Sequence, residues 1–304
     1  MSFFLGIDGG TTKTEITVIN AHKDIIFECT TGPTALSSVD IQTIKMSIRI
    51  ALKPFLDANQ NTTFDAVFMG IDGLNFLPET IEIESMLETL PCISDSTKLY
   101  VRHNMENALY AGQCFEEGIV LIAESKTVAF GKDLFRTHRC GGWGYKEGEL
   151  GSSYALGIDA IRYAIRAYDG RYMVDQFAID IGKAIGLNEA TDIIQVMDDF
   201  YGKHGKVASL APIVTIHANN LNPYAMRIID RATDELALAV RGVYDHLKLK
   251  NKTLVIVGGL GNSSGYFKDQ LEAKIYDINP DFRIIRPLMK PSQAAALMAK
   301  RLSK

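Results

Sequence analysis

The chain begins with alternating apolar and polar residues that are interrupted by a short glycine-rich turn. Residues 3–20 read FFLGIDGGTTKTEITVIN, in which two segments rich in aromatic and β-branched residues flank the turn. Such segments are typical of strands, and a glycine-rich break between two of them is typical of a hairpin. Residues 24–32, DIIFECTTG, have the same character. We therefore predict a hairpin with threonine hydroxyls in its turn, followed by a third strand.

The rest of the first half alternates between helical and strand patterns. The predicted elements are a helix over residues 39–57, a buried strand over 64–74, a helix over 78–90, and a strand running directly into a helix over 98–113. Ser38 or Asp40 would be the N-cap of the first helix. Pro78 stands at the start of the second, where proline is favoured.

The pattern of strand, polar turn and strand restarts at Gly118 and extends to residue 133. It is followed by predicted helices over residues 151–170, 173–187, 190–202 and 222–249, a buried strand, glycine turn and helix over 252–275, and a last helix over 291–302. We find no low-complexity linker between the halves. We therefore predict two domains, residues 1–117 and 118–304, and leave open whether the last helix packs back on the first domain.

Length and composition indicate a globular protein. The 304 residues are 47% hydrophobic and 22% charged, which allows substantial cores in about two domains. The net charge of −4 and the pI near 5.9 give no electrostatic signal for nucleic acid. The apolar stretches are much shorter than the ~20 residues of a membrane span, and the first residues do not resemble a signal peptide. We expect neither a nucleic-acid nor a membrane partner.

The cysteines and histidines give no sign of a metal site. The four cysteines are scattered without a C-x-x-C pair, and the six histidines have no metal-binding spacing. Scattered cysteines are typical of reduced thiols in a cytoplasmic protein. We therefore expect a cytoplasmic location, with neither a disulfide framework nor a zinc site.

The segment GIDGGTTKTE, residues 6–15, combines glycines and hydroxyls in a way that suits phosphate binding. It is not a P-loop, because no pair of glycines frames Lys13 at the required spacing. It is not a dinucleotide fingerprint, because a strand rather than a helix follows the glycines. The hairpin turn is a candidate phosphate site of another kind, although a tight turn with solvated hydroxyls would have the same composition.

Three segments in this order resemble one known superfamily: DGGTTK at 8–13, CGGWGYKEGELGSSYALG at 140–157 and VGGLGNSS at 257–264. Together they resemble the actin-like ATPase fold shared by sugar kinases, Hsp70 and actin. Within it the chain looks like the BadF/BadG/BcrA/BcrD ATPase family, and most like its N-acetylglucosamine kinase branch. The resemblance implies an α/β fold of two actin-like ATPase (RNase H-like) domains, with mixed five-stranded sheets that flank a nucleotide cleft.

The resemblance also implies where ATP and Mg²⁺ bind. In the family, glycines let the main chain approach the phosphates, and N–H groups and hydroxyls bind them. Asp8 would hold Mg²⁺ through water, as suits a cation that stays partly hydrated. The implied nucleotide-binding residues are Asp8, Gly9, Gly10, Thr11, Thr12 and Lys13 in the hairpin, Ser125 and Thr127 in the second turn, and Gly258, Gly259, Gly261 and Asn262 in the late segment.

A sugar site is implied by the middle segment. Trp143 and Gly144 would lie against the sugar, and Glu149 takes the acidic position where the family has aspartate. A core position for Trp143 is the alternative. Thr34 stands where the kinase branch has an asparagine that binds the sugar, and it could serve only partly.

The chain departs from the family pattern at the catalytic base. Asn104 stands where the family has the aspartate that takes the proton from the sugar hydroxyl. An amide can orient a hydroxyl but cannot accept its proton, and losing a general base costs ~10²–10⁴ in rate. Glu106 is close in sequence, but on a helix it would point about 200° away from position 104. The sequence therefore indicates a weakened catalytic site.

The second phosphate turn also departs from the family. Residues 124–127 read ESKT where the family has G-T-G-S, so both glycines are missing. Glu124 adds negative charge where a triphosphate should lie, unless it faces solvent. Ser125 and Thr127 retain hydroxyls, and Lys126 could offset the charge.

Two functions remain open from the sequence. The first is an ATP-dependent kinase for N-acetylglucosamine or a related amino sugar, with a weakened catalytic site. The second is a catalytically inactive pseudokinase that senses a sugar or a nucleotide. The iron–sulphur ATPases of the same family are disfavoured, because they hold a cluster with paired cysteines that this sequence lacks. The resemblance makes a homodimer plausible, which no sequence feature establishes.

Overall fold

The computed structural model describes residues 2–74, 76–124, 126–143 and 150–304. The chain divides into two compact units. Unit 1 consists of residues 2–115 together with Pro287–Lys304, and unit 2 consists of Glu116–Arg286. The division between Phe115 and Glu116 lies two residues before the boundary that the sequence predicted, and the last helix belongs to unit 1.

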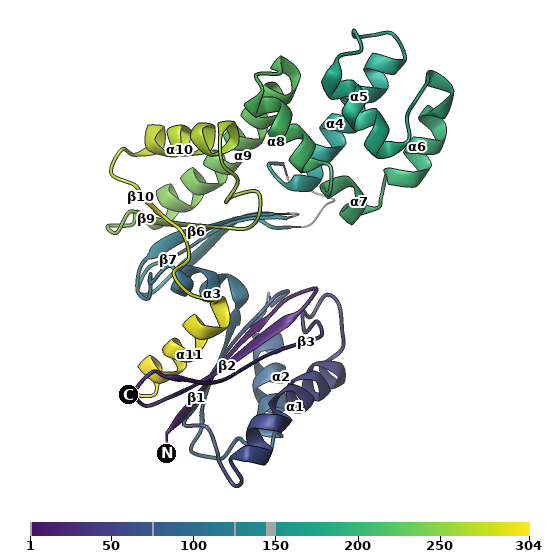
Figure 1. Ribbon diagram of the computed structural model, residues 1–304. Helices are drawn as coiled ribbons and strands as arrows, with labels where there is room; N and C mark the ends of the chain where they lie inside the picture. Colours follow the sequence, from purple (N-terminus) through teal and green to yellow (C-terminus); the bar gives the residue numbers. More distant parts are fainter. Residues whose placement is uncertain (1, 75, 125, 144–149) are drawn as a thin grey trace. The chain divides into compact units, whose positions relative to one another are not determined.

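Unit 1 is a mixed five-stranded sheet with helices on both faces. Its elements are β1 (Phe3–Gly9), β2 (Thr14–Asn20), β3 (Ile25–Thr31), α1 (Ile41–Ala58), β4 (Ala66–Ile71), α2 (Leu77–Glu88), β5 (Lys98–His103), α3 (Asn104–Ala111) and α11 (Pro291–Leu302). The strand order is β3-β2-β1-β4-β5. The first three strands are antiparallel, whereas β4 and β5 run parallel to β1. Helices α1 and α2 cover one face, and α3 and α11 cover the other (Figure 1).

The alternation of side chains along β1 produces a core on each face of this sheet. Leu5 and Ile7 pack against the side of α1 and α2. Phe4, on the opposite face, packs with residues of α3 and α11. Because successive strand residues point to opposite faces, one strand with apolar residues at nearly every position supplies both cores.

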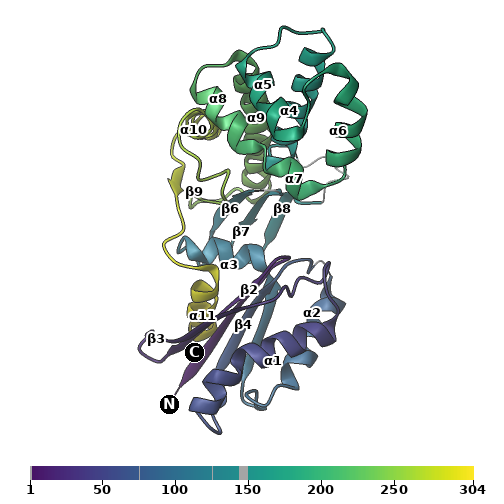
Figure 2. The same ribbon diagram turned by 45° about the vertical axis from the view of Figure 1, so that its right-hand side comes forward.

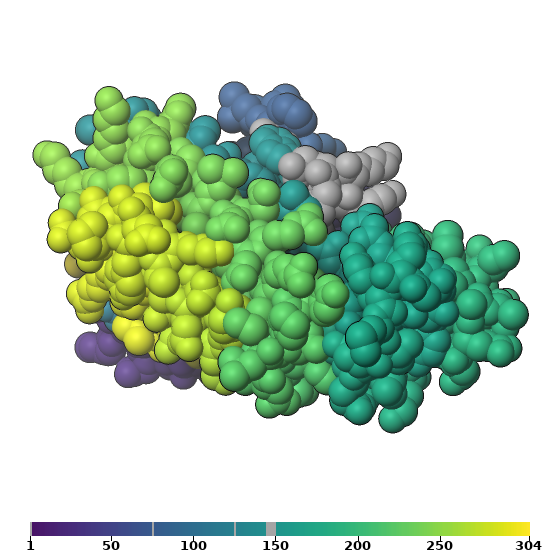
Figure 3. Space-filling model, turned by 90° about the horizontal axis from the view of Figure 1, so that it is seen from above, coloured from purple at the N-terminus to yellow at the C-terminus, as the bar shows by residue number. Residues whose placement is uncertain are grey.

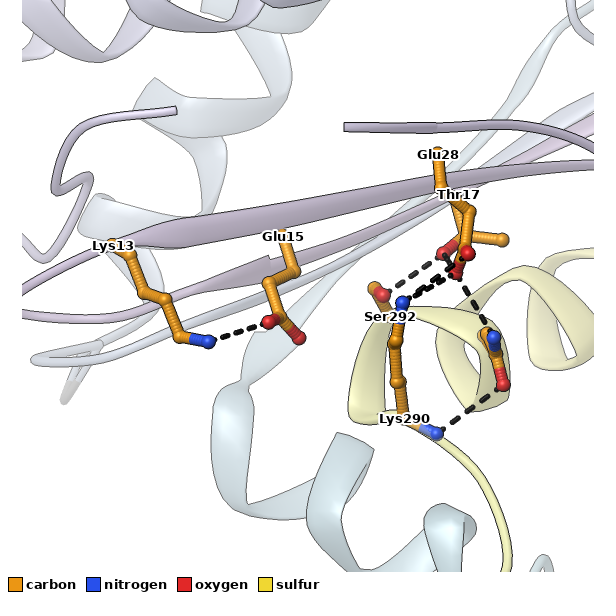
Figure 4. Close-up of polar contacts among 7 residues, drawn as sticks. Lys13, Glu15, Thr17, Glu28, Lys290 and Ser292 are labelled. Carbon is orange, nitrogen blue, oxygen red and sulfur yellow. Dashed lines mark hydrogen bonds and ion pairs between the residues drawn. The ribbon is translucent and has the colours of Figure 1, made fainter. Parts of the chain in front are cut away.

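Helix α11 lies directly on β1, and a glycine makes this close approach possible. A Cβ on Gly6 would lie 2.2 Å from the Ala296 nitrogen and from the Ser292 carbonyl oxygen. The Ser292 hydroxyl lies 2.9 Å from the Thr17 hydroxyl on β2. Two side chains from the start of the helix also donate hydrogen bonds to Glu28 on β3 (Figure 4). The end of the chain is therefore an integral layer of unit 1.

Unit 2 contains a second five-stranded mixed sheet. Its elements are β6 (Gly118–Ala123), β7 (Thr127–Lys132), β8 (Thr137–Gly141), α4 (Ser153–Tyr168), α5 (Gln176–Ile185), the 3₁₀-helix η1 (Ala190–Asp192), α6 (Ile193–Phe200), α7 (His204–Ala208), α8 (Ala211–Asn219), α9 (Pro223–Leu247), β9 (Thr253–Val257), α10 (Tyr266–Ile278) and β10 (Arg283–Ile285). The strand order is β10-β9-β6-β7-β8. The first hairpin of this unit is antiparallel, and β9 is parallel to β6. The sheet thus repeats the strand order of unit 1.

The helices of unit 2 form a layer whose core is shared with one face of the sheet. Buried residues of β6 and β9 pack with buried residues of α4, α5, α8, α9 and α10 in one continuous cluster. Figure 2 shows α8, α9 and α10 beside the helices α4 to α7. In the space-filling view, the green and yellow segments of α8 to α10 gather on one part of this layer and the teal segments of α4 to α6 on another (Figure 3).

Most predicted elements are present, and the four that the sequence analysis missed share a weak pattern. They are β8, α7, α8 and β10. β8, α7 and β10 have five, five and three residues, which is too short for a clear period. α8 carries Pro212 near its start and apolar residues on several sides, so it has no single apolar face. Asp40, rather than Ser38, caps α1 by accepting a hydrogen bond from the Thr43 N–H.

We predict that Gly6→Ala destabilises the protein because its methyl group would overlap the backbone of α11. The expected loss is about 2 kcal/mol, as for overpacked cores. Chemical unfolding followed by circular dichroism measures it. Gly32→Ala is the matched control, because a Cβ there has no protein atom within 4 Å. Equal stability of the two variants would contradict the prediction.

Candidate functional site

Polar residues gather at one edge of the unit 1 sheet, where the parallel strands β1, β4 and β5 end. The Gly9 carbonyl oxygen, at the end of β1, accepts a 2.9 Å hydrogen bond from the Asp72 N–H just after β4. It also accepts a 3.4 Å hydrogen bond from the Asn104 side-chain amide just after β5. The shared carbonyl brings Asp72 and Asn104 together beside the phosphate-type hairpin.

The hairpin turn between β1 and β2 presents its hydroxyls to solvent. The Gly10 N–H donates to the Lys13 carbonyl oxygen at 3.1 Å, which closes the turn. Thr11, Thr12 and Lys13 are exposed. The Lys13 ammonium lies 2.6 Å from the Glu15 carboxylate (Figure 4). The turn therefore has the form expected of a phosphate site, with its lysine paired to a carboxylate of the same hairpin.

Asp8 is held in place by an asparagine that the sequence analysis did not identify. The Asn107 side-chain amide donates to the Asp8 carboxylate at 2.7 Å and to the Ile7 carbonyl oxygen at 3.1 Å. Asn107 is fully buried, and a Cβ on Gly70 would overlap it at 2.2 Å. Its position in the middle of α3 carries no sequence signal, because contact with Asp8 depends on how α3 packs on β1.

Burial raises the pKa of Asp8 to about 7. The hydrogen bond from Asn107 opposes this shift. The neighbouring carboxylates Glu15 and Asp72 raise the pKa further, and Lys13 lowers it. A cation close to Asp8 would offset the unfavourable burial of its negative charge.

Asp72 is the second residue that the sequence analysis missed. Its carboxylate lies 4.0 Å from the His103 Nε2 and has 27% of its side-chain surface exposed. His103 is held from the other side, because its Nδ1 accepts a hydrogen bond from the Met105 N–H at the start of α3. The sequence did contain a signal for Asp72, because this carboxylate lies in GIDG at 70–73, directly after a predicted buried strand.

Glu106 does not reach this edge of the sheet. It is buried, and its carboxylate accepts a hydrogen bond from the Tyr110 hydroxyl one turn along α3. Burial, followed by the nearby Glu106 charge, raises the pKa of that phenol well above its usual range. Position 104 and position 106 therefore face different surroundings, as their helical spacing predicted.

Thr34 is packed beneath the hairpin of unit 1. It is fully buried, and its hydroxyl lies 2.8 Å from the Thr14 hydroxyl. A Cβ on Gly9 would lie 2.4 Å from the same hydroxyl oxygen, and the Thr34 N–H donates to the Gly10 carbonyl oxygen. The structure thus packs this position under Gly9 and Gly10, and its contact with a sugar stays a prediction.

Unit 2 contains a cavity of about 610 Å³ beside the late glycine segment. Its wall is formed by Gly259, Leu260 and Ser263 on one side and by residues from 208 to 215 of α7 and α8 on the other. Glu124 and Ser153 also line it. A largely apolar cavity with a few hydroxyls is typical of a small-molecule site.

The three glycines of this segment have different surroundings. A Cβ on Gly259 would meet no protein atom within 4 Å, so this position opens toward free space. Gly258 has φ of 100°, and a Cβ there would lie 2.4 Å from the Ala123 carbonyl oxygen. A Cβ on Gly261 would lie 2.8 Å from the Ile256 side chain. Gly258 and Gly261 are thus required by the turn itself, whereas Gly259 leaves room for a ligand.

Asn262, another predicted nucleotide contact, is exposed, and its N–H donates to the Gly258 carbonyl oxygen.

The second turn is less suited to phosphate than the hairpin of unit 1. Glu124 is exposed and lines the cavity. Thr127 is buried, and its hydroxyl donates to the Leu150 carbonyl oxygen at 3.3 Å. The Thr127 hydroxyl therefore supports the main chain in this structure, and its contact with a phosphate stays a prediction. Ser125 lies outside the described residues.

Trp143 is 64% exposed, which excludes a core position. The Arg139 guanidinium lies 3.9 Å from the centre of its ring, a cation–π contact. An exposed indole backed by a cation can lie against the apolar face of a ligand. Gly144 and Glu149, the other predicted sugar contacts of this segment, lie outside the described residues.

Among the described residues, we find no group of three or more His, Cys, Asp or Glu side chains that could hold a metal ion. Each of the four cysteines is a thiol that is not part of a disulfide. Within the described ranges, each helix is too short or too polar to cross a membrane.

Known proteins with similar sequences are sugar kinases. The chain is 27% identical to the N-acetylmuramic acid/N-acetylglucosamine kinase of Clostridium acetobutylicum, with 99% of each chain covered. It is 25% identical to the N-acetyl-D-glucosamine kinase of Dictyostelium discoideum, with 97% of each chain covered.

Solved structures with the same fold also span the whole chain. A Chromobacterium violaceum protein with the provisional name N-acetylglucosamine kinase matches with a TM-score of 0.76 at 21% identity, covering 98% of this chain and 99% of that one. A ROK family glucokinase from Streptomyces griseus matches with a TM-score of 0.56 at 14% identity, covering 99% and 100%. These matches confirm the predicted actin-like ATPase fold.

The family comparison is the most specific of these findings. The sequence pattern of one family matches residues 5–299, which include the hairpin of unit 1 and the glycine segment of unit 2. The chain is therefore a member of the BadF/BadG/BcrA/BcrD ATPase family.

Proposed function

We propose that this protein is an ATP-dependent kinase that phosphorylates N-acetylglucosamine or a related amino sugar. Membership of an ATPase family implies ATP binding, and both curated relatives are kinases of amino sugars. The observation that carries the proposal is the shared Gly9 carbonyl, which holds Asp72 and Asn104 beside Asp8 and the hydroxyl-rich turn. A phosphoryl acceptor needs a proton acceptor and a phosphate-binding group in one place.

The cavity of unit 2 is suited to the nucleoside part of ATP. Its volume of about 610 Å³ lies within the range of small-molecule sites. The open position at Gly259 lets a flat base lie on the main chain, and Ser153, Ser209 and Thr215 offer hydroxyls along the wall. Glu124 would lie near the phosphates, which disfavours tight binding of the triphosphate.

Asp8 is the residue that fits Mg²⁺. Magnesium prefers one or two carboxylates together with water and substrate phosphates, and the half-buried Asp8 carboxylate with its oriented hydrogen bond to Asn107 matches that need. Magnesium would neutralise charge on the ATP phosphates. Asn107 would keep the Asp8 carboxylate pointing in one direction.

Asp72 is our candidate for the proton acceptor that Asn104 cannot be. In the proposed step, Asn104 orients the sugar hydroxyl, whose proton passes to the Asp72 carboxylate. The hydroxyl oxygen forms a bond to the γ-phosphorus, and the bond from that phosphorus to the bridging oxygen breaks to leave ADP. His103, 4.0 Å from Asp72, would hold the carboxylate in position.

A pseudokinase that senses a sugar or nucleotide is the second candidate. Two observations favour it: the amide at position 104, and the exposed carboxylate of Glu124 on the wall of the nucleotide cavity. Binding of ATP and an amino sugar by calorimetry, with no ADP release even at high enzyme concentration, would establish the sensor and reject the kinase.

We predict that the wild-type protein releases ADP with N-acetylglucosamine or a close relative, and that Asp72→Asn lowers kcat by about 10²–10⁴-fold, the loss typical of a removed general base. The KM values should change much less, because the amide keeps the size of the side chain. Coupled ADP-release assays measure both constants.

Two further variants make this test specific. In the Asp72→Asn background, Asn104→Asp should restore much of the rate, because it supplies a carboxylate at the start of α3, directly after the adjacent strand β5. Asp57→Asn, an exposed carboxylate on α1 paired with Lys53, should leave the rate unchanged. Full activity of Asp72→Asn would reject Asp72 as the proton acceptor.

We expect Gly259→Val to weaken ATP binding by about tenfold or more, since it fills the open position in the cavity wall and ~1.4 kcal/mol corresponds to tenfold. Gly205→Val is the matched control, because a Cβ there also has free space but does not line the cavity. Calorimetric titration with ATP measures the difference. Unchanged affinity for Gly259→Val would place the nucleoside elsewhere.

Asp8→Asn should raise the melting temperature of the ligand-free protein at pH 8 by a few degrees. Burial raises the pKa of Asp8 to about 7 in the folded protein, above its value of about 4 in an unfolded chain. Protonation of Asp8 therefore stabilises the folded protein, and this stabilisation is complete below pH ~4 and is lost as the pH rises through 7. At pH 8 the wild type carries a buried charge that the amide lacks, and this advantage of the variant should shrink toward pH 5. Thermal unfolding from pH 5 to 8 measures the trend, and a constant difference would contradict it.

A further inference from the structure

We propose that unit 2 has a second binding site, distinct from the nucleotide cavity, for a small phosphorylated molecule. The site is a groove of about 330 Å³ between α4 and α9. We call it the arginine groove, after the residues that define it: Arg162, Arg166, Arg227 and Arg231, together with Tyr163, Tyr172 and Tyr224.

The arginines face one another from two helices. Arg162 and Arg166 are four residues apart on α4, and Arg227 and Arg231 are four residues apart on α9. Residues at this spacing share one face of a helix. All four line the same groove, so like charges are gathered on both sides of it. Such an arrangement is unfavourable unless an anion compensates it.

The protein itself compensates only part of this charge. Asp159, the one carboxylate among the residues that line the groove, contacts Arg162 at 3.1 Å and Arg231 at 3.3 Å. Asp169 lies near Arg166 but is bound by Arg171. Among the residues that the structure describes, Arg166 and Arg227 form no ion pair. These two guanidinium groups are available to a ligand.

The tyrosines give the groove an aromatic wall. The ring centre of Tyr224 lies 4.4 Å from that of Tyr163 and 5.2 Å from that of Tyr172. The Arg227 guanidinium lies 4.6 Å from the Tyr224 ring centre, and its Nε donates to the Pro223 carbonyl oxygen. Arg227 is therefore partly fixed before any ligand arrives, which lowers the entropic cost of binding.

This combination selects a class of ligand. The planar fork of an arginine matches phosphate oxygens with two hydrogen bonds. The tyrosine rings can cover the apolar face of a sugar or another compact group. Neither feature suits a neutral sugar alone. The chemistry favours a phosphate ester of about monosaccharide size.

The groove is structurally connected to the segment that carries Trp143. A smaller cavity shares Asp159, Ile228 and Arg231 with the groove and extends to Leu150 and Gly151. A Cβ on Gly151 would lie 2.9 Å from the Ala232 carbonyl oxygen of α9, so this main chain is in direct contact with the helix. A ligand that moves α9 would therefore displace the end of the segment. Any effect of such a displacement on sugar affinity rests on the proposed function, whereas binding in the arginine groove does not.

Calorimetric titration without ATP or Mg²⁺ tests the site directly. The probes are inorganic phosphate, N-acetylglucosamine 6-phosphate and N-acetylglucosamine. We expect both phosphates to bind to the wild type, and the sugar phosphate to bind more tightly. Arg166→Ala and Arg227→Ala should each weaken the binding of the sugar phosphate about tenfold or more, the usual effect of losing a hydrogen bond to a charged group. Arg241→Ala, an exposed arginine of α9 that does not line the groove, should bind as the wild type does.

The outcomes separate this proposal from the kinase proposal. If the protein binds the sugar phosphate through Arg166 and Arg227 but releases no ADP, the groove proposal stands and the kinase proposal is rejected. If both variants bind the sugar phosphate as tightly as the wild type, or if the wild type does not bind it at millimolar concentrations, the groove proposal is rejected. This holds whether or not the protein releases ADP. If the wild type binds no phosphate and forms a dimer that Arg166→Glu converts to monomers, the groove proposal is rejected and the groove is instead an interface between two copies of the chain.

Discussion

The parallel pairing of β1, β4 and β5 is the constraint on which the candidate site of unit 1 depends. Pairing places Gly9 opposite Ile71 and Ile71 opposite His103, so the residues that follow β4 and β5 arrive at one edge. Asp72 and Asn104 then share the Gly9 carbonyl oxygen. A shift of one residue in either register would turn these side chains toward the opposite face of the sheet.

Local patterns predicted the elements that build this edge. The hairpin, the strand that leads into GIDG and the strand that runs into α3 were all read from alternation, apolar content and glycine. The resemblance of the three glycine-containing motifs, taken in order, to a known family predicted the fold, which the solved structures confirm. Motifs of this kind are readable because they combine residue type with a fixed local spacing.

The sequence analysis missed those site residues whose role depends on contacts with residues far away in the sequence. Asn107 meets Asp8 across 99 positions of the chain, and Asp72 becomes part of the site because two strands pair beside it. Thr34 and Thr127 show the converse. Both occupy motif positions at which the chain differs from the family, and tertiary packing turns their hydroxyls toward Thr14 and the Leu150 carbonyl. The motif gave a position in the chain, and packing decided the direction of each side chain.

The docking of α11 on β1 has a consequence for the biosynthesis of the protein. Unit 2 is a continuous segment, whereas unit 1 needs α11 to cover one face of its sheet. Because α11 follows the whole of unit 2 in the sequence, the first strands to be made keep part of their apolar surface uncovered until all of unit 2 has been synthesised. Transiently exposed apolar surface makes such intermediates prone to aggregate.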